Sequence, residues 1–244
     1  MRDKLAVLSI FLLIILSFSG YAKSSSNNSS TALNMPLKIT QPTNGALCNS
    51  QAKCPVVIVI SNFGVSNSDY TFVSKAFNQR GYLSVVMANE FNGALWNYRD
   101  KMGLSVRYEN WQRAVNTVKT VIEQLTILYP KYDFSELTLL GHSNGGDISV
   151  LFATIHPDKV HTVVTLANRR MLLPRNKKIR TLTLRTDDAE LDNRLLLSNV
   201  ELKHYPVKQI TIANASKDDM HDGGPKWLVE RISKEVELFL DYPF

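Results

Sequence analysis

The pattern of apolar and polar positions divides most of the chain into short apolar runs that alternate with longer amphipathic segments. Residues 55–60 form a continuous run rich in β-branched side chains, which is typical of a strand covered on both faces. Similar or shorter runs predict further strands at 36–40, 82–87, 136–140, 160–166, 179–184 and 209–212. The spacing of these runs leaves room for a helix between most of them.

Apolar residues recur at helical spacing in the segments between the runs. Residues 106–128 show this most clearly, with Trp111, Val115, Val118 and Ile122 on one face. Further helices are expected at 69–80, 144–155 and 227–239. Strands that alternate with helices form mainly parallel sheets covered by helices on both faces, so we expect one α/β domain over residues 35–244.

The first residues do not fit this domain. A charged head at 1–4 precedes an almost unbroken apolar run from Leu5 to Gly20, and Gly20 and Ala22 suit a cleavage site. This layout is typical of a secretory signal peptide over residues 1–22, since a spanning helix needs about 20 apolar residues. Residues 23–34 are rich in Ser and Asn and are expected to form a disordered linker. We therefore expect an exported protein, periplasmic or secreted, with no membrane insertion once the leader is removed; a retained anchor is the alternative.

The chain has two cysteines, Cys48 and Cys54. In the oxidising compartment that export implies, a local disulfide between them is expected. Free thiols are the alternative. A metal site is not indicated, because no His or second Cys pair lies nearby at ligand spacing.

The formal net charge of +6 is carried by basic residues scattered among acidic ones. Clusters occur only at 169–170 and 177–180, and no aromatic residues interleave with them. This indicates a solvated basic surface, with attraction to anionic surfaces as a further interpretation, and no nucleic-acid partner is expected.

The candidate chemistry lies in the hexapeptide Gly141-His142-Ser143-Asn144-Gly145-Gly146, directly after the apolar run 137–140. It places G-x-S-x-G between a predicted strand and a predicted helix, an arrangement that exposes a nucleophilic serine on a strained turn. The motif and the order of elements resemble the α/β-hydrolase superfamily from about residue 36 to the end. The resemblance implies an α/β-hydrolase fold, a mainly parallel sheet with helices on both faces, and Ser143 as the nucleophile.

In that superfamily the acid and then the base follow the nucleophile, each on a loop at the carboxyl end of a strand. The resemblance points to Asp188 as the acid, with Asp187 as the reserve; Arg185 stands where the family commonly has glycine. His221 is the single histidine in the loop after the last predicted strand and is implied as the base. An imidazole that takes the serine proton and a carboxylate that orients the imidazole complete the expected triad.

The remaining histidines have structural interpretations. His142 is expected to pack under the turn or to edge the pocket, and His156 to contact a helix C-terminus. His161 opens a predicted strand. His204 lies on the approach to the last strand and stays an alternative base.

Two backbone N–H groups are implied as the oxyanion hole. One belongs to Asn144, directly after the nucleophile, and the other to Phe63, in the loop after the strand 55–60. Family members often have His-Gly in that loop, whereas this chain has Asn62-Phe63-Gly64. Whether the Asn62 side chain contributes stays open.

The segment 167–178 is too short for a cap domain, so an open site walled by loops 89–102 and 168–172 is expected. The first of these loops contains Phe91, Trp96 and Tyr98. Arg169 and Arg170 are expected on the solvated rim of the site, with binding of an anionic substrate group as the alternative. No metal or organic cofactor is expected, because Walker and dinucleotide-binding motifs are missing from the sequence.

Together these features predict an exported serine hydrolase, first of all a carboxylic-ester hydrolase acting on a small-molecule or acyl ester through an acyl-enzyme on Ser143. Amidases, peptidases and acyltransferases share the same triad and are alternatives. A non-catalytic protein of the same fold that binds a ligand is the alternative from another class. The sequence defines neither the acyl chain length nor the oligomeric state.

Overall fold

The computed structural model describes residues 36–43, 48–89, 104–188 and 195–242. The chain divides into two units, residues 1–32 and 33–244, and every described residue belongs to the second. The predicted leader at 1–22, the predicted linker at 23–34, and Phe91, Trp96 and Tyr98 lie outside the described residues.

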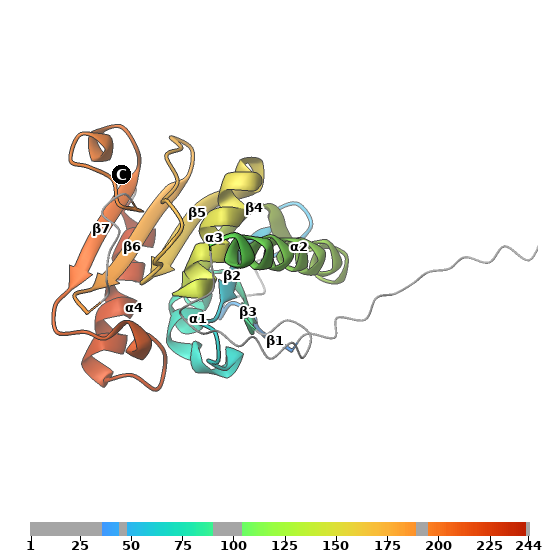
Figure 1. Ribbon diagram of the computed structural model, residues 1–244. Coiled ribbons are helices and arrows are strands. Elements are labelled where there is room, and N and C mark those ends of the chain that lie inside the picture. The colour runs from blue at the N-terminus through green and yellow to red at the C-terminus, as the bar shows by residue number, and fades with distance from the viewer. Residues whose placement is uncertain (1–35, 44–47, 90–103, 189–194, 243–244) are drawn as a thin grey trace, which may run out of the picture. The chain divides into compact units, whose positions relative to one another are not determined.

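The strands in these ranges form one sheet with the order β1-β3-β2-β4-β5-β6-β7 (Figure 1). They are β1 (Leu37–Thr40), β2 (Cys54–Ile60), β3 (Leu83–Met87), β4 (Tyr132–His142), β5 (Val160–Leu166), β6 (Arg180–Thr186) and β7 (Val207–Ile212). All neighbouring strands are parallel except β1, which pairs antiparallel with β3 at one edge. The predicted α/β class with a mainly parallel sheet is confirmed.

Helices cover both faces of the sheet. They are α1 (Thr71–Asn78), α2 (Leu104–Leu128), α3 (Asn144–Ile155) and α4 (Lys226–Asp241) (Figure 1). One core layer packs α2 and α3 against one face, and a second packs α1 and α4 against the other. In β2, Ile58 belongs to the first layer and Val57 and Val59 to the second, and all three are fully buried. This two-sided burial explains why the strand shows a continuous apolar run. None of the helices in the described ranges combines the length and apolar character that a membrane-spanning helix needs.

Strand β4 begins earlier than the predicted range 136–140. Tyr132 and Asp133 pair with the first residues of β2, and the register then shifts before Val57 pairs with Thr138. The expected disulfide between Cys48 and Cys54 is present, with their Cα atoms 5.2 Å apart, and fixes the segment that leads into β2.

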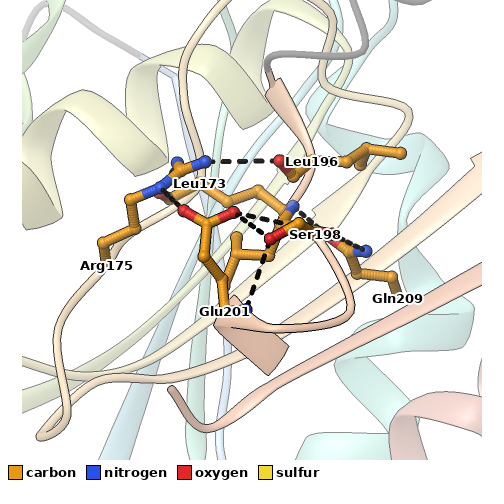
Figure 2. Close-up of polar contacts among 7 residues, drawn as sticks. Leu173, Arg175, Leu196, Ser198, Glu201 and Gln209 are labelled. Carbon is orange, nitrogen blue, oxygen red and sulfur yellow. Dashed lines mark hydrogen bonds and ion pairs between the residues drawn. The ribbon is translucent and has the colours of Figure 1, made fainter. Parts of the chain in front are cut away.

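A polar cluster joins the segment before β6 to the segment before β7 (Figure 2). Nε of Arg175 donates to Oε1 of Glu201 at 2.7 Å, and Oε2 of Glu201 accepts from the Ser198 N–H at 2.8 Å. The hydrogen bond from Arg175 is the main reason that the pKa of Glu201 falls to about 2. On β7, the Gln209 side chain makes two hydrogen bonds to the backbone of the same segment. The cluster thereby links the segments that lead into β6 and β7, the two strands whose carboxyl ends lead to Asp188 and His221.

Candidate active site

Ser143 lies at the junction of β4 and α3 in a backbone conformation that L-residues rarely adopt, with φ 50° and ψ −110°. Its N–H donates to the Leu166 carbonyl at 2.7 Å, and its own carbonyl accepts from the Asp147 N–H at 3.1 Å. Conformations of this kind cost roughly 1–3 kcal/mol and collect at functional sites. The side chain is half-buried. The predicted strand, turn and helix around Ser143 are therefore present.

The glycines on either side of Ser143 are required by close backbone contacts. A Cβ on Gly141 would overlap the carbonyl oxygen of Gly145, and a Cβ on Gly145 would overlap the carbonyl oxygen of Ile60 at the end of β2. Any larger residue at either position would push α3 away from the sheet. The G-x-S-x-G spacing thus follows from the contact between helix α3 and the ends of β2 and β4.

His142 lies beneath this turn and is fully buried. Its Nδ1 lies 2.9 Å from Oη of Tyr70, and its Nε2 lies 2.7 Å from the carbonyl oxygen of Lys217. Of the two positions expected for His142, packing under the turn is the one observed. Burial lowers the pKa of His142 to about 4, so the ring is neutral at physiological pH.

The two candidate acids both contact the loop between β7 and α4. Asp188 accepts from the Ser216 hydroxyl and from the Lys217 N–H, each at 3.0 Å. Burial alone would raise its pKa, but the nearby Thr186 hydroxyl and these two donors outweigh burial and hold the pKa of Asp188 below its usual value. Asp187 accepts from the Asn214 N–H at 3.0 Å. Asp188 therefore contacts the loop at residues 216–217, which are closer to His221 along the chain than Asn214, the contact of Asp187.

His221 lies half-buried in the same loop, with its ring against Gly223. Its Nδ1 accepts from the Gly223 N–H at 3.1 Å. Within the described ranges no hydrogen bond joins His221 to Asp188 or to Ser143. Because Nδ1 accepts here, the neutral ring carries its proton on Nε2, whereas a base that receives a serine proton on Nε2 needs the other tautomer. The structure thus places the three predicted residues at the same edge of the sheet without a hydrogen-bonded triad.

The residue after His221 fastens the loop to helix α1. The carboxylate of Asp222 accepts from the Thr71 N–H at 2.7 Å and from the Thr71 hydroxyl at 2.6 Å, at the start of that helix. The Asp222 N–H in turn donates to the Asp69 carbonyl at 2.8 Å. A carboxylate at a helix N-terminus is favourable because the backbone N–H groups there lack partners within the helix.

Both residues predicted for the oxyanion hole, Phe63 and Asn144, take part in hydrogen bonds with described side chains. The Phe63 N–H donates to Oδ1 of Asn62 at 2.8 Å, so an oxyanion at Phe63 would replace that side-chain oxygen. The Asn62 N–H donates to Oη of Tyr70 at 2.8 Å. On the other side, Oδ1 of Asn144 accepts from Nε1 of Trp111 on α2 at 2.8 Å. The helical pattern marks Trp111 only as a core residue, and no motif in the sequence singles out Tyr70.

One wall of the site is built on a buried carboxylate. Oδ1 of Asp147 accepts from the N–H groups of Arg169, Arg170 and Met171 at 2.9 to 3.1 Å. Burial raises the pKa of Asp147, and Arg170 and these N–H groups oppose the rise. Arg169 and Arg170, which the sequence analysis expects on the solvated rim, are half-buried. The buried Arg185 interacts electrostatically with Asp147, and burial lowers the pKa of its guanidinium to about 10.

A separate cavity of about 320 Å³ lies far from Ser143. It is lined by residues from the second half of α2, the end of α3 and the start of β4, including Ile122, Phe134 and Phe152. Because β4 runs from this cavity to the serine, the two lie at opposite ends of the strand. Among the described residues, no cluster of three or more His, Cys, Asp or Glu side chains is suited to hold a metal ion.

Comparisons with known proteins give structural matches only. No protein-family model matches the sequence, and no curated protein matches it. The solved structure of Est1E from Butyrivibrio proteoclasticus is 16% identical with a TM-score of 0.54, covering 84% of this chain and 93% of that chain. A serine hydrolase without a lid from Xanthomonas campestris is 14% identical with a TM-score of 0.57, covering 85% and 88%. Thermogutta terrifontis esterase 2 is 12% identical with a TM-score of 0.60, covering 85% and 89%. Together with the sheet order and the turn at Ser143, these matches establish that the chain has the α/β-hydrolase fold.

Proposed function

We propose that this protein is a serine hydrolase that cleaves carboxylic esters, with Ser143 as nucleophile, His221 as base and Asp188 as acid. The observation that carries the proposal is the backbone of Ser143, held at φ 50° between two glycines that the packing requires. This turn holds the half-buried Ser143 at the carboxyl edge of the sheet, the position of the nucleophile in such hydrolases. The structural neighbours named as esterases or serine hydrolases support the same chemistry by analogy.

The proposed reaction has two steps. Oγ of Ser143 attacks the ester carbonyl carbon while its proton passes to Nε2 of His221. The tetrahedral intermediate collapses, the bond to the alcohol oxygen breaks, and His221 returns the proton to the leaving alcohol. Water then attacks the acyl-enzyme, gives its proton to His221, and releases the carboxylic acid as the proton returns to Ser143.

The chemistry requires one rearrangement at His221. Its Nδ1 must release the Gly223 N–H and carry a proton toward a carboxylate, so that Nε2 faces Ser143 unprotonated. Asp188 is the proposed partner because it already holds the loop at Lys217. The N–H groups of Phe63 and Asn144 are proposed to stabilise the oxyanion, which displaces Oδ1 of Asn62 from Phe63.

The proposed substrate is a short or accessible ester. Strands β5 and β6 are joined by only residues 167–179, in which the structure has no helix or strand that could build a cap domain. An open site of this kind accepts a small molecule or the exposed acyl ester of a larger one. The same site would serve an amidase, peptidase or acyltransferase, and an ester and amide panel separates these.

Export is part of the proposal. It is supported by the leader pattern at 1–22 and by the disulfide between Cys48 and Cys54, since disulfides persist in oxidising compartments. N-terminal sequencing of protein recovered outside the cytoplasm is expected to begin at Lys23. A chain that still begins at Met1 in the membrane fraction would contradict cleavage.

A second candidate function is ligand binding without turnover. It is favoured by one observation, the hydrogen bonds of Asp188 and His221, which both go to the surrounding loop and not to each other. A binding protein would need no base facing Ser143.

Ester hydrolysis by the purified mature protein distinguishes the two candidates. Short aryl esters are expected to be cleaved, and Ser143→Ala and His221→Ala to lower kcat/KM by at least ~10³-fold. His204→Ala is the matched control for His221→Ala, and Asp187→Asn is the matched control for Asp188→Asn. The kcat/KM of each control variant is expected to stay within a few-fold of the wild-type value. Full activity in Ser143→Ala would refute the proposal, and inactivity of the folded wild type toward every ester and amide would favour ligand binding.

A further inference from the structure

A buried chain of hydrogen bonds begins at the loop that carries Phe63. The Asn62 N–H donates to Oη of Tyr70 at 2.8 Å. Tyr70 is fully buried just before helix α1, and its ring meets His142 edge-on with the ring centres 6.0 Å apart. The position of the oxyanion loop is therefore tied to a side chain in the core.

The hydrogen bonds of His142 have defined directions. Nε2 lies 2.7 Å from the Lys217 carbonyl, which can only accept, so Nε2 carries the proton of the neutral ring. Nδ1 must then accept, and the Tyr70 hydroxyl 2.9 Å away donates to it. The Tyr70 hydroxyl therefore accepts a hydrogen bond from the Asn62 N–H and donates one to Nδ1 of His142. Burial raises the pKa of Tyr70 and lowers that of His142, which keeps both groups neutral.

The chain continues to the candidate acid. Lys217 accepts from His142 through its carbonyl, while its N–H donates to the carboxylate of Asp188 at 3.0 Å. Lys217 of the β7–α4 loop is thus hydrogen-bonded both to His142 in the nucleophile turn and to Asp188 after the end of β6. His221 lies four residues further along this loop.

We propose that Tyr70 and His142 are positioning residues that keep the oxyanion loop, the nucleophile turn and the base loop in register. This inference rests on the proposed function, because it assigns the loops their catalytic roles. Neither residue touches the substrate: Tyr70 acts through Asn62, and His142 acts through Lys217. The described contacts link these three loops through Tyr70 and His142, which are fully buried, while Asn62 and Lys217 at either end of the pair are half-buried.

An apolar pair of similar size would fill the same space without the cost of burying a hydroxyl and an imidazole. The polar pair instead fixes the direction of three backbone groups at the edge of the sheet. A misplacement of about 1 Å in a catalytic group lowers the rate by up to ~10²-fold, so the expected effect of losing this link lies on kcat.

The test compares Tyr70→Phe with Tyr82→Phe. Tyr70→Phe keeps the buried ring and removes both hydrogen bonds of Oη. Tyr82→Phe makes the same chemical change beside α1, where the ring packs on Phe77 and the Tyr82 hydroxyl makes no hydrogen bond to another described residue. We expect Tyr70→Phe to lower kcat for a short ester by ~10- to 100-fold with KM within about two-fold, and Tyr82→Phe to change neither by more than about two-fold.

The second comparison uses His142 and is independent of the folding of Tyr70→Phe. His142→Gln retains an amide that can donate to the Lys217 carbonyl, whereas His142→Phe cannot donate. We expect His142→Gln to keep at least about five-fold more kcat than His142→Phe when both are assayed well below their unfolding temperatures. The rate of phosphonylation of Ser143 by a fluorophosphonate should follow the same order, because the adduct also uses the oxyanion loop.

The outcomes separate the two proposals. A folded wild type that neither cleaves esters nor reacts with the fluorophosphonate overturns the proposed function itself. An active wild type with Tyr70→Phe equal to Tyr82→Phe, or with His142→Gln equal to His142→Phe, overturns the positioning role and leaves the proposed function standing. A loss in Tyr70→Phe that appears in KM instead of kcat also overturns it.

Discussion

Acidification is expected to destabilise the folded protein through His142. The ring is fully buried, and burial lowers its pKa from 6.5 to about 4. The hydrogen bond to the Lys217 carbonyl and the charge of Asp218 oppose this shift only in part. The unfolded chain therefore takes up a proton on this residue between pH 6.5 and 4, while the folded protein does not. Stability from the neutral ring is fully present above pH 6.5 and is lost as the pH falls toward about 4.

The magnitude follows from the same two values. At about 1.4 kcal/mol for each pKa unit, the loss of stability from this residue between pH 7.5 and pH 4.5 is about 2–3 kcal/mol. This is a large part of the ~5–15 kcal/mol that stabilises a typical domain. Protonation of His142 should also break the hydrogen bond that the Tyr70 hydroxyl donates to Nδ1, because a protonated Nδ1 is itself a donor.

Urea unfolding of the wild type and His142→Gln at pH 4.5, 5.5, 6.5 and 7.5 measures this effect. Carboxylates that titrate in the same range are shared by the two proteins, so the difference between their slopes isolates His142. The wild type should lose about 2–3 kcal/mol more than His142→Gln over this range. Equal pH dependence in both proteins would show that His142 is not held neutral in the folded state.

Other predictions concern the surroundings of the site and the start of β2. Trp111→Phe removes the donor to Asn144 and should lower kcat by roughly five-fold, with about 1 kcal/mol of stability lost; unchanged ester kinetics would contradict a role in orienting Asn144. Asp147→Ala leaves three backbone N–H groups without their acceptor and should destabilise the protein by about 3–5 kcal/mol in urea unfolding, and a loss below 1 kcal/mol would refute this account of the wall. Paired replacement of Cys48 and Cys54 by Ala should lower the free energy of unfolding by about 2 kcal/mol, because the closed loop is short, and should leave ester turnover unchanged. A loss of turnover in the folded variant would link the disulfide to the site. Because a protonated imidazole cannot accept the serine proton, the rate of ester cleavage should rise with pH between about 5 and 8, and a flat profile over this range would exclude a histidine base.

The strands and helices were largely predictable because burial leaves a direct trace in the sequence. The run at 55–60 reads as a strand because alternate residues of β2 enter different core layers. The helix predicted at 144–155 has the observed bounds, since the strained turn and His156 delimit it. Strand β4 was underestimated because the exposed Ser135 and Glu136 interrupt the apolar pattern, while pairing with β2 continues beyond them.

The candidate site was predictable only where it depends on local geometry. The positive φ at Ser143 and the lack of space at Gly141 and Gly145 are properties of a short segment, and the motif encodes them. The partners of His142 lie 72 and 75 residues away along the chain, and no local pattern marks Tyr70 or Lys217 as its neighbours. Arg185 was visible as a charge at the end of an apolar strand, but its burial near Asp147 depends on how β6 packs relative to α3.

The central claim is that Ser143 is an activated nucleophile, and covalent labelling tests it most directly. The purified mature protein is treated with a fluorophosphonate probe, and the adduct is mapped by mass spectrometry. We predict a single adduct on Ser143 that is lost in Ser143→Ala and His221→Ala and retained in His204→Ala. Absence of an adduct on folded wild-type protein, or an adduct on Ser143 that persists unchanged in His221→Ala, would contradict the claim.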